Sequence, residues 1–178
     1  MPLKFLKLYG VRDMRSGWIK PAVFAVVFAL AGCGQAMDKA RAATAQDNLK
    51  SGQDFLAKTA KAPGVVVLPS GVMYRVVARS LKPGPQPTIA DKVTINYEGK
   101  LITGQVFDSS YERHEPATFP LARLILAWQE AIPKMHVGDE IVLYTPPSAA
   151  YGERDMSPDI PPNSTLIFRV HLIAIGGE

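Results

Sequence analysis

The feature that most constrains the fold is a change of pattern at Pro63, beyond which short apolar runs follow one another with strand-like spacing. In the clearest run, Val93, Ile95 and Tyr97 alternate with polar residues, as expected of a strand with one buried face. Further candidate strands are residues 72–77, 101–107, 139–145 and 166–175. The proline-rich segment 82–87 is predicted to connect strands, because proline cannot donate a hydrogen bond within a sheet.

Only one segment after Pro63 favours an α-helix. Residues 122–132 carry apolar side chains on one helical face, and Pro133 ends the segment. That face comprises Leu124, Ile125, Trp128 and Ile132. Several strands with a single helix predict an α+β domain, in which an antiparallel β-sheet wraps around one short α-helix. About 110 residues are enough for one hydrophobic core but not for two.

The net positive charge of the chain lies before Cys33. The chain has 20 Lys and Arg residues against 16 Asp and Glu residues, and five of the basic and one of the acidic residues precede Cys33. The remaining chain therefore carries 15 of each and no net formal charge. The basic balance belongs to a targeting segment and gives no reason to expect a nucleic-acid partner.

Residues 1–32 have the layout of a secretory signal, with a positive stretch, an apolar run at 22–30 and then small residues. The apolar run of about ten residues is shorter than the roughly 20 needed to cross a bilayer. Leu30-Ala31-Gly32-Cys33 resembles the lipobox of bacterial lipoproteins, which implies cleavage before Cys33 and acylation of its thiol and of the new amino terminus. The alternative is an ordinary signal followed by a chance cysteine.

Cys33 is the only cysteine, so no disulfide can form within the chain and an anchor is the best use for its thiol. Two or more acyl chains would hold the protein stably on a membrane. Gly34, in place of an aspartate, favours the outer membrane. Met14 is an alternative start, because residues 14–20 form a compact positive region by themselves.

Residues 33–63 are predicted to form a tether or short helical arm before the domain at 64–178. The segment is rich in Ala, Lys, Gln and Asp, and Leu49, Gly52 and Leu56 fall on one helical face. Its large apolar side chains are too few for the core of a dimer of the usual area, so we expect a monomer.

Four blocks follow one another in register over about 70 residues. They are Asn96-Tyr97-Glu98-Gly99-Lys100, Val106-Phe107-Asp108-Ser109-Ser110, Ala150-Tyr151-Gly152 and Ile160-Pro161-Pro162-Asn163-Ser164-Thr165-Leu166. This order resembles the FKBP-type peptidyl-prolyl cis-trans isomerases from about Pro69 to the C-terminus. Residues 48–69 resemble the end of the helical arm in macrophage-infectivity-potentiator-like members, which dimerise through a longer arm.

The resemblance implies a pocket that binds proline. Its implied catalytic residues are Tyr97, Phe107, Asp108, Ile125, Trp128, Tyr151 and Phe168, and its implied substrate-binding residues are Arg113, Leu124, Ala150 and Ile160. Trp128 would form the floor and the other apolar side chains the walls. The Tyr151 hydroxyl and the Ile125 N–H would donate to a substrate carbonyl, and Arg113 would pair with Asp108. The alternative is that these aromatic residues are plain core.

Isomerisation of a prolyl bond needs no nucleophile and no cofactor. The barrier to rotation is about 18–20 kcal/mol, because the amide resonance must be broken. Each 1.36 kcal/mol of transition-state stabilisation, approximately, gives a tenfold rate increase. An apolar cavity that holds proline, excludes water and favours the twisted amide is therefore sufficient.

Three departures from the family pattern favour a rival interpretation. Ala127 stands where the family usually has glycine before the tryptophan, and its methyl group is expected to lie close to the substrate path. Met156 and Asp159 place unusual side chains at the rim. These features favour a proline-binding chaperone or docking module with weak isomerase activity.

Other candidate sites are weak. His114, His136 and His171 are isolated in the sequence, so no metal site is predicted. No Gly-x-Ser-x-Gly motif and no phosphate-binding glycine loop is present.

The sequence therefore predicts a lipid-anchored isomerase that faces the periplasm from the outer membrane and assists the folding of exported proteins. Expected partners are X-Pro segments of unfolded or partly folded clients and the membrane, with macrolides of the tacrolimus and rapamycin type as candidate ligands.

Overall fold

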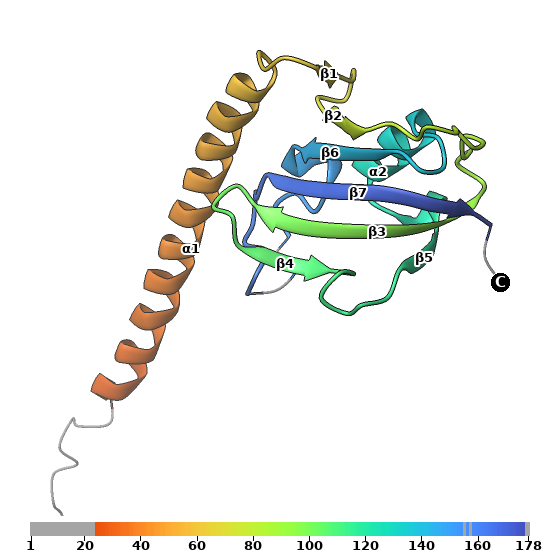
Figure 1. Ribbon diagram of the computed structural model, residues 1–178. Helices are drawn as coiled ribbons and strands as arrows, with labels where there is room; N and C mark the ends of the chain where they lie inside the picture. Colours follow the sequence, from red (N-terminus) through yellow and green to blue (C-terminus); the bar gives the residue numbers. More distant parts are fainter. Residues whose placement is uncertain (1–23, 155, 157, 177–178) are drawn as a thin grey trace, which may run out of the picture. The chain divides into compact units, whose positions relative to one another are not determined.

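The computed structural model describes residues 24–154, 156 and 158–176, and side chains only from residue 38 onward. Helix α1 (Phe24–Thr59) precedes a seven-stranded sheet (Figure 1). The strands are β1 (Val65–Val67), β2 (Met73–Ala78), β3 (Lys92–Leu101), β4 (Val106–Ser109), β5 (Ala117–Pro120), β6 (Glu140–Thr145) and β7 (Leu166–Ile175). The remaining elements are helix α2 (Leu126–Ala131) and the 3-10 turns at Leu121–Arg123, Ile132–Lys134 and Pro147–Ala149.

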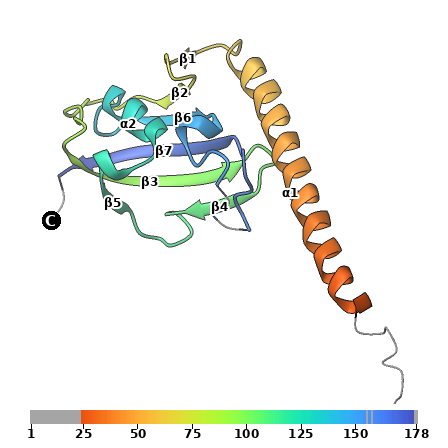
Figure 2. The ribbon, with the colours of Figure 1, turned by 180° about the vertical axis from the view of Figure 1, so that it is seen from behind.

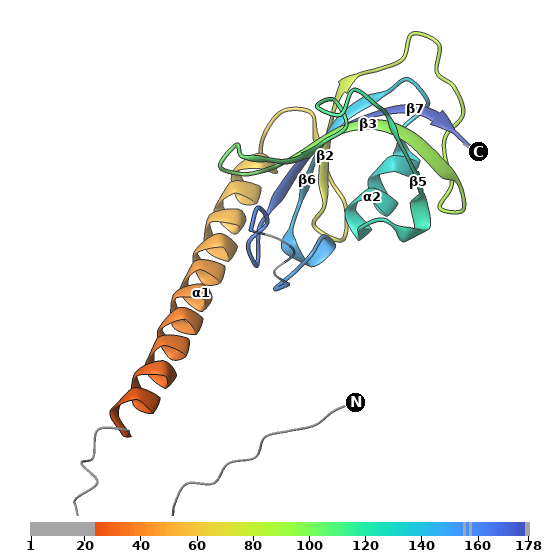
Figure 3. The ribbon, with the colours of Figure 1, turned by 90° about the horizontal axis from the view of Figure 1, so that it is seen from below.

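The sheet is antiparallel throughout and has the order β1-β2-β6-β7-β3-β4, with β5 beside β3. Strands β3 and β7 pair from Val93 opposite Ile175 to Leu101 opposite Leu166. Figures 2 and 3 show α2 against one face of the sheet, which curves around it. The predicted α+β fold, an antiparallel sheet around one short helix with a helical arm before it, is confirmed.

Burial alternates along β3 as the sequence predicted. Val93, Ile95, Tyr97 and Gly99 are buried, and the residues between them are partly exposed. The buried face of the sheet packs with Trp128 and the other apolar residues of α2 into one core.

The predicted strand at 101–107 is wrong, because a turn divides it. Strand β3 ends at Leu101, and the Leu101 N–H donates to the Gln105 carbonyl. Gly104 has a φ of 93°, a conformation that glycine adopts without steric cost. Ile102 and Thr103 have side chains typical of strands, but the chain reverses at Gly104 and β4 begins at Val106.

The predicted helix at 122–132 is too long. Leu124 and Ile125 have extended backbone, with ψ values of 173° and 151°, and α2 begins only at Leu126. The side chain of Gln129 donates to the carbonyls of Leu124 (2.7 Å) and Ala122 (3.2 Å). These bonds keep the loop in its extended conformation, whereas the apolar periodicity alone predicted a continuous helix. The short strands β1 and β5 were not predicted.

The C-terminal part of α1 packs on the domain. From residue 39 onward, one face of the helix is partly or fully buried, namely Ala45, Asn48, Leu49, Gly52, Phe55, Leu56 and Thr59. The ring of Phe55 lies 6.0 Å from that of Tyr144 on β6, measured between centroids. Gly52 allows close approach, since a Cβ there would overlap Thr165 Oγ1 and lie 3.1 Å from Thr165 Cβ. The arm is therefore a docked helix over this part.

The predicted signal peptide lies mostly outside the described residues. Residues 1–23 are not described, and at Cys33 only the helical backbone is. In the part of the chain that the structure covers, no helix combines the length and apolarity needed to cross a membrane.

Asp139 ties the turn before β6 to the end of β2. Its carboxylate is 1% exposed and accepts from the N–H groups of Ser80 (2.9 Å) and His136 (3.0 Å) and from the Arg79 guanidinium (2.7 Å). Burial alone would raise the pKa of Asp139, but these donors outweigh it and lower the pKa below its usual value.

Replacing Asp139 by asparagine should lower the free energy of unfolding at pH 7 by about 1.5–3 kcal/mol, the range for hydrogen bonds to a charged group. Because the folded-state pKa is depressed, this contribution is complete above the unfolded pKa of about 3.9 and is lost as the pH falls below it. Urea unfolding at pH 7 and pH 3 measures the difference. Glu112→Gln makes the same chemical change at an exposed side chain and should have little effect. An equal loss for Asp139→Asn at both pH values would contradict the assignment.

Candidate active site

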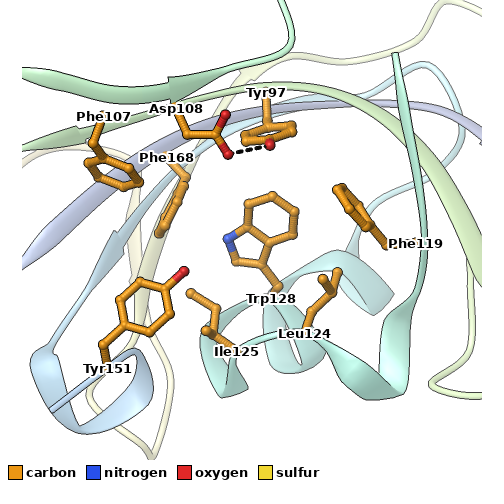
Figure 4. Close-up of a pocket in the computed structure, with 9 residues that line it drawn as sticks. All are labelled: Tyr97, Phe107, Asp108, Phe119, Leu124, Ile125, Trp128, Tyr151 and Phe168. Atoms are coloured by element: carbon orange, nitrogen blue, oxygen red, sulfur yellow. Dashed lines mark hydrogen bonds between the residues drawn. The ribbon is translucent and has the colours of Figure 1, made fainter. Parts of the chain in front are cut away.

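A cavity of about 200 Å³ opens between the sheet and α2 (Figure 4). Nine residues line it: Tyr97, Phe107, Asp108, Phe119, Leu124, Ile125, Trp128, Tyr151 and Phe168. They come from β3, β4, β5, β7, the α2 region and the turn after Pro147–Ala149. Its lining is predominantly apolar, with one carboxylate and two phenols.

Trp128 forms the floor of the cavity and is 5% exposed. Two rings stand edge-on to it, Tyr97 at 5.3 Å and Phe168 at 5.2 Å between centroids. Edge-to-face packing at these distances is favourable and fixes the orientation of the indole. Within the described part of the chain, no group accepts a hydrogen bond from the buried Trp128 Nε1.

Gly99 makes room for one wall of the cavity. A Cβ at this position would lie 2.7 Å from two ring carbons of Phe107 and 2.9 Å from Phe168 Cε1. The two phenyl rings pack edge to face over the glycine, 5.8 Å apart. The glycine is therefore required by the close approach of the rings to the strand.

Three polar residues form a network at the edge of the cavity. The Tyr97 hydroxyl donates to Asp108 Oδ2 (2.5 Å), and the Arg113 guanidinium donates to Asp108 Oδ1 and to the Tyr97 hydroxyl oxygen (2.9 Å). The guanidinium also lies over the Tyr97 ring, 5.5 Å from its centroid. Both carboxylate oxygens of Asp108 thus have partners within the domain.

Ser110 holds this network in place from behind. Its hydroxyl accepts from the Tyr97 N–H (2.8 Å), and its own N–H donates to the Tyr97 carbonyl (2.9 Å). Ser110 is completely buried. The chain after β4 is therefore fixed to β3 beside Tyr97.

Both phenols of the cavity keep their protons in the neutral range. Burial raises the pKa of Tyr97, and its hydrogen bond to Asp108 raises it further. Burial also raises the pKa of Tyr151, with a smaller contribution from the charge of Asp108. The Tyr151 hydroxyl points into the cavity (Figure 4) and is not hydrogen-bonded to any described residue.

The structure brings together eight of the residues predicted for the site, and Arg113 joins them through Asp108. Ile160 is 9% exposed and belongs to the core, while Ala150 packs against the core, and neither lines the cavity. Phe119 lines the cavity but was not predicted. Its signal was the alternation within Ala117-Thr118-Phe119-Pro120, which is too short to identify a strand.

The expectation that the Ala127 methyl lies near the substrate path is wrong. Ala127 is completely buried in the core and does not line the cavity. The reason is that α2 begins at Leu126, so Trp128 faces the cavity and Ala127 faces inward. Met156 is exposed, and Asp159 accepts from the Gln105 side chain (3.4 Å).

Among the described residues, no group of three or more His, Cys, Asp or Glu side chains is placed to hold a metal ion. His136 Nδ1 lies 3.7 Å from Asp139 Oδ2, but one such pair does not make a metal site.

Two family patterns match the chain. Residues 84–173 match the FKBP-type peptidyl-prolyl cis-trans isomerase family, and residues 10–76 match the domain amino-terminal to FKBP-type peptidyl-prolyl isomerases. The first match contains the whole cavity, and the second contains α1.

Curated relatives and solved structures agree with this. The chain is 46% identical over 128 residues to peptidyl-prolyl cis-trans isomerase Mip of Coxiella burnetii, which covers 72% of this chain and 55% of the relative. It is 41% identical over 131 residues to FkpA of Escherichia coli, covering 74% and 47%. The chain thus spans about half the length of the curated relatives it matches.

The crystal structure of Escherichia coli FkpA superposes with a TM-score of 0.79 at 35% identity, over 91% of this chain and 75% of that one. A peptidyl-prolyl cis-trans isomerase from Pseudomonas syringae superposes with a TM-score of 0.68 at 30% identity, over 74% of this chain and 96% of that one.

Replacing Gly99 by alanine should lower the free energy of unfolding by about 1–3 kcal/mol, because the added methyl group overpacks the wall formed by Phe107 and Phe168. Denaturant unfolding measures the loss. Adding Phe107→Leu to the variant removes the ring carbons that the methyl meets and should recover part of the stability. A fully stable Gly99→Ala variant would show that the rings do not approach the strand this closely.

Proposed function

Because this chain belongs to the family of FKBP-type peptidyl-prolyl cis-trans isomerases, we propose that its cavity binds the proline of an X-Pro segment and catalyses rotation about the preceding peptide bond. The observation that carries the proposal is the cavity itself. It is floored by Trp128, walled by aromatic rings and closed at one edge by the Tyr97–Asp108–Arg113 network.

The apolar walls lower the barrier by removing water from the bond. In water, hydrogen bonds to the amide oxygen favour the planar, charge-separated form of the amide, so its loss of resonance is costly. In the cavity the proline ring lies on Trp128 between Tyr97 and Phe168, and the amide is shielded from solvent. The twisted amide, which is less polar, is favoured there over the planar one.

Hydrogen-bond donors orient the substrate. The Tyr151 hydroxyl points into the cavity without a partner among the described residues and can donate to a substrate carbonyl. Ile125 precedes the first turn of α2, where amide N–H groups have no intrahelical acceptor, and its N–H is the second donor. Each donor reaches the substrate carbonyl in good geometry only when the peptide bond is twisted. Its hydrogen bond therefore stabilises the transition state more than the ground state.

Asp108 shapes the edge of the cavity and does not act as a base. Its two oxygens accept from Tyr97 and Arg113, and rotation about the peptide bond breaks no bond that would require a base. The network holds the Tyr97 ring in place and sets a negative charge beside the bound peptide. No step of the reaction moves a proton.

A second candidate function is a proline-binding chaperone or docking module with weak turnover. The exposed Met156 and Asp159, which the family resemblance places at the rim, favour it, since they would add adaptable and polar contacts for a client chain. Ala127 no longer supports it, because its side chain is buried away from the cavity. A measurement of turnover on a short X-Pro peptide, compared with binding of the same peptide, separates the two.

Turnover on a short X-Pro peptide should be nearly constant between about pH 6 and pH 9, because no group has to gain or lose a proton. The raised pKa values of Tyr97 and Tyr151 keep both phenols protonated throughout this range. Serine and cysteine reagents should leave the rate unchanged. A bell-shaped pH profile from well-folded protein would point to an acid–base pair and would contradict this mechanism.

The clients and the oligomeric state extend the proposal. Clients are X-Pro segments of unfolded or partly folded exported proteins, and macrolides of the tacrolimus and rapamycin type are ligands that would compete for the same cavity. A monomer is supported by the arm, because Leu49, Phe55 and Leu56 face their own domain and not an outer surface.

We also propose that the protein is a lipoprotein that faces the periplasm from the outer membrane, with residues 1–32 as the signal peptide. Leu30-Ala31-Gly32-Cys33 supports the anchor. A relative from Legionella longbeachae, 40% identical over 131 residues and covering 74% of this chain and 55% of that one, is named outer membrane protein MIP. The chain after Cys33 carries no net formal charge, so an acyl anchor and not net charge would hold it on an anionic membrane.

Expression of the full chain in a bacterium should give a protein that begins at an acylated Cys33. Intact mass should show the loss of residues 1–32 and the gain of acyl chains, and the protein should partition into detergent. Cys33→Ser should abolish both changes. A soluble protein with an unmodified Cys33 would overturn the anchor without affecting the proposed isomerase activity.

A further inference from the structure

The docked part of α1 is hydrogen-bonded to the loop that precedes β7. Asn48 Nδ2 donates to the Pro162 carbonyl (3.0 Å), and Asn163 Nδ2 donates to the Ala45 carbonyl (3.4 Å). Figure 1 shows the helix beside this loop and the turn between β3 and β4. The helix and the loop are therefore joined by two hydrogen bonds, one donated by each element.

The same loop is bonded to the turn that carries Tyr151. The Asn163 N–H donates to the Gly152 carbonyl (2.8 Å), and the Gly152 N–H donates to the Pro147 carbonyl (2.9 Å). Asn163 has a φ of 58°, in the left-handed region that asparagine tolerates better than most residues. One residue thus joins the helix, through its side chain, to the turn, through its backbone.

The turn is closely packed on the side of the core, where Ala149 is 2% exposed, but not on the side of the helix. A cavity of about 380 Å³ lies between the helix and the turn, with Leu49 and Leu56 on one side and Pro147 and Gly152 on the other. Since space is available on the side of the helix, the hydrogen bonds through Asn163 are what join the turn to the helix there. Loss of these bonds would free the turn on that side and let the Tyr151 hydroxyl shift at the cavity.

We propose that Asn48 and Asn163 are positioning residues for Tyr151, so that the docked arm sets the place of the hydroxyl that binds the substrate carbonyl. The inference rests on the proposed isomerase function for its effect on turnover. It assigns the arm a role in the reaction beyond that of a tether.

The test uses the full chain with Asn48→Asp, which keeps the size of the side chain but replaces the donor with a carboxylate facing the Pro162 carbonyl. Gln46→Glu makes the same amide-to-carboxylate change on the exposed side of the helix and is the matched control. Thermal unfolding confirms that both variants are folded.

Hydrogen exchange of backbone amides measures the coupling between the helix and the turn independently of enzyme turnover. The N–H of Asn163, which donates to Gly152, should exchange several-fold faster in Asn48→Asp and at the original rate in Gln46→Glu. Unchanged exchange in Asn48→Asp would overturn the proposal. If exchange is faster in Asn48→Asp but the wild-type protein does not isomerise an X-Pro peptide, the coupling between helix and turn stands. Only the proposed isomerase function is then refuted.

Turnover of an X-Pro peptide measures the effect of this coupling on catalysis. Asn48→Asp should lower kcat by about threefold to tenfold, the range for one lost hydrogen bond, and Gln46→Glu should not. In a Tyr151→Phe background the same substitution should change kcat by less than about twofold, because the hydroxyl that it misplaces is already absent. An equal loss in both backgrounds would show that Asn48 acts on stability and not through Tyr151.

If Asn48→Asp fails to fold, Asn163→Gly replaces it. Glycine adopts the positive φ of this position and keeps the N–H that donates to Gly152, but it lacks the side chain that reaches Ala45. Turnover of Asn163→Gly is then measured with Tyr151 and with Tyr151→Phe. A smaller loss in the Tyr151→Phe background supports an effect through Tyr151, and an equal loss in both indicates an effect on stability.

Discussion

The register of β3 is the constraint on which the rest of the structure depends. This strand pairs with β4, β5 and β7, and it contributes Tyr97 to the cavity and Gly99 to the space behind its wall. Side chains alternate between the two faces of a strand, so a slip by one residue would turn Tyr97 toward solvent. Burial of the alternate residues between Val93 and Gly99 fixes the register, and the site is built on it.

Tyr97 and Asp108, two of the polar residues that line the cavity, are held by hydrogen bonds to other parts of the domain. Asp108 accepts from Tyr97 and from Arg113, and Ser110 bonds both backbone groups of Tyr97. Such networks are favourable only when every member is satisfied. Two donors at the cavity, the Tyr151 hydroxyl and Trp128 Nε1, have no partner among the described residues. Thr145 and Thr165 also have buried hydroxyls without a partner among the described residues, but neither lines the cavity where a peptide would bind.

Regular periodicity could be predicted from the sequence, and its interruptions could not. The alternation of β3 and the long run of β7 were predicted, because burial on one face leaves a direct trace in the sequence. The helix at 122–132 was predicted too long, since its apolar spacing continues through Leu124 and Ile125 while the Gln129 side chain holds that loop extended. Phe119 was missed and Ala127 was misplaced because both depend on where a short element begins, which neighbours decide.

In the docked arm, Gly52 lowers the stability of the helix itself but allows the helix to pack on the domain. Glycine within a helix costs about 1 kcal/mol relative to alanine, and Gly52 lies in the interior of α1. Any larger side chain would meet Thr165, whose hydroxyl is buried beneath the helix without a partner among the described residues. An isolated tether would gain from alanine here and would leave that hydroxyl in water. The residue at position 52 therefore favours docking over helix stability, which is expected if the helix has to lie against the loop that leads to Tyr151.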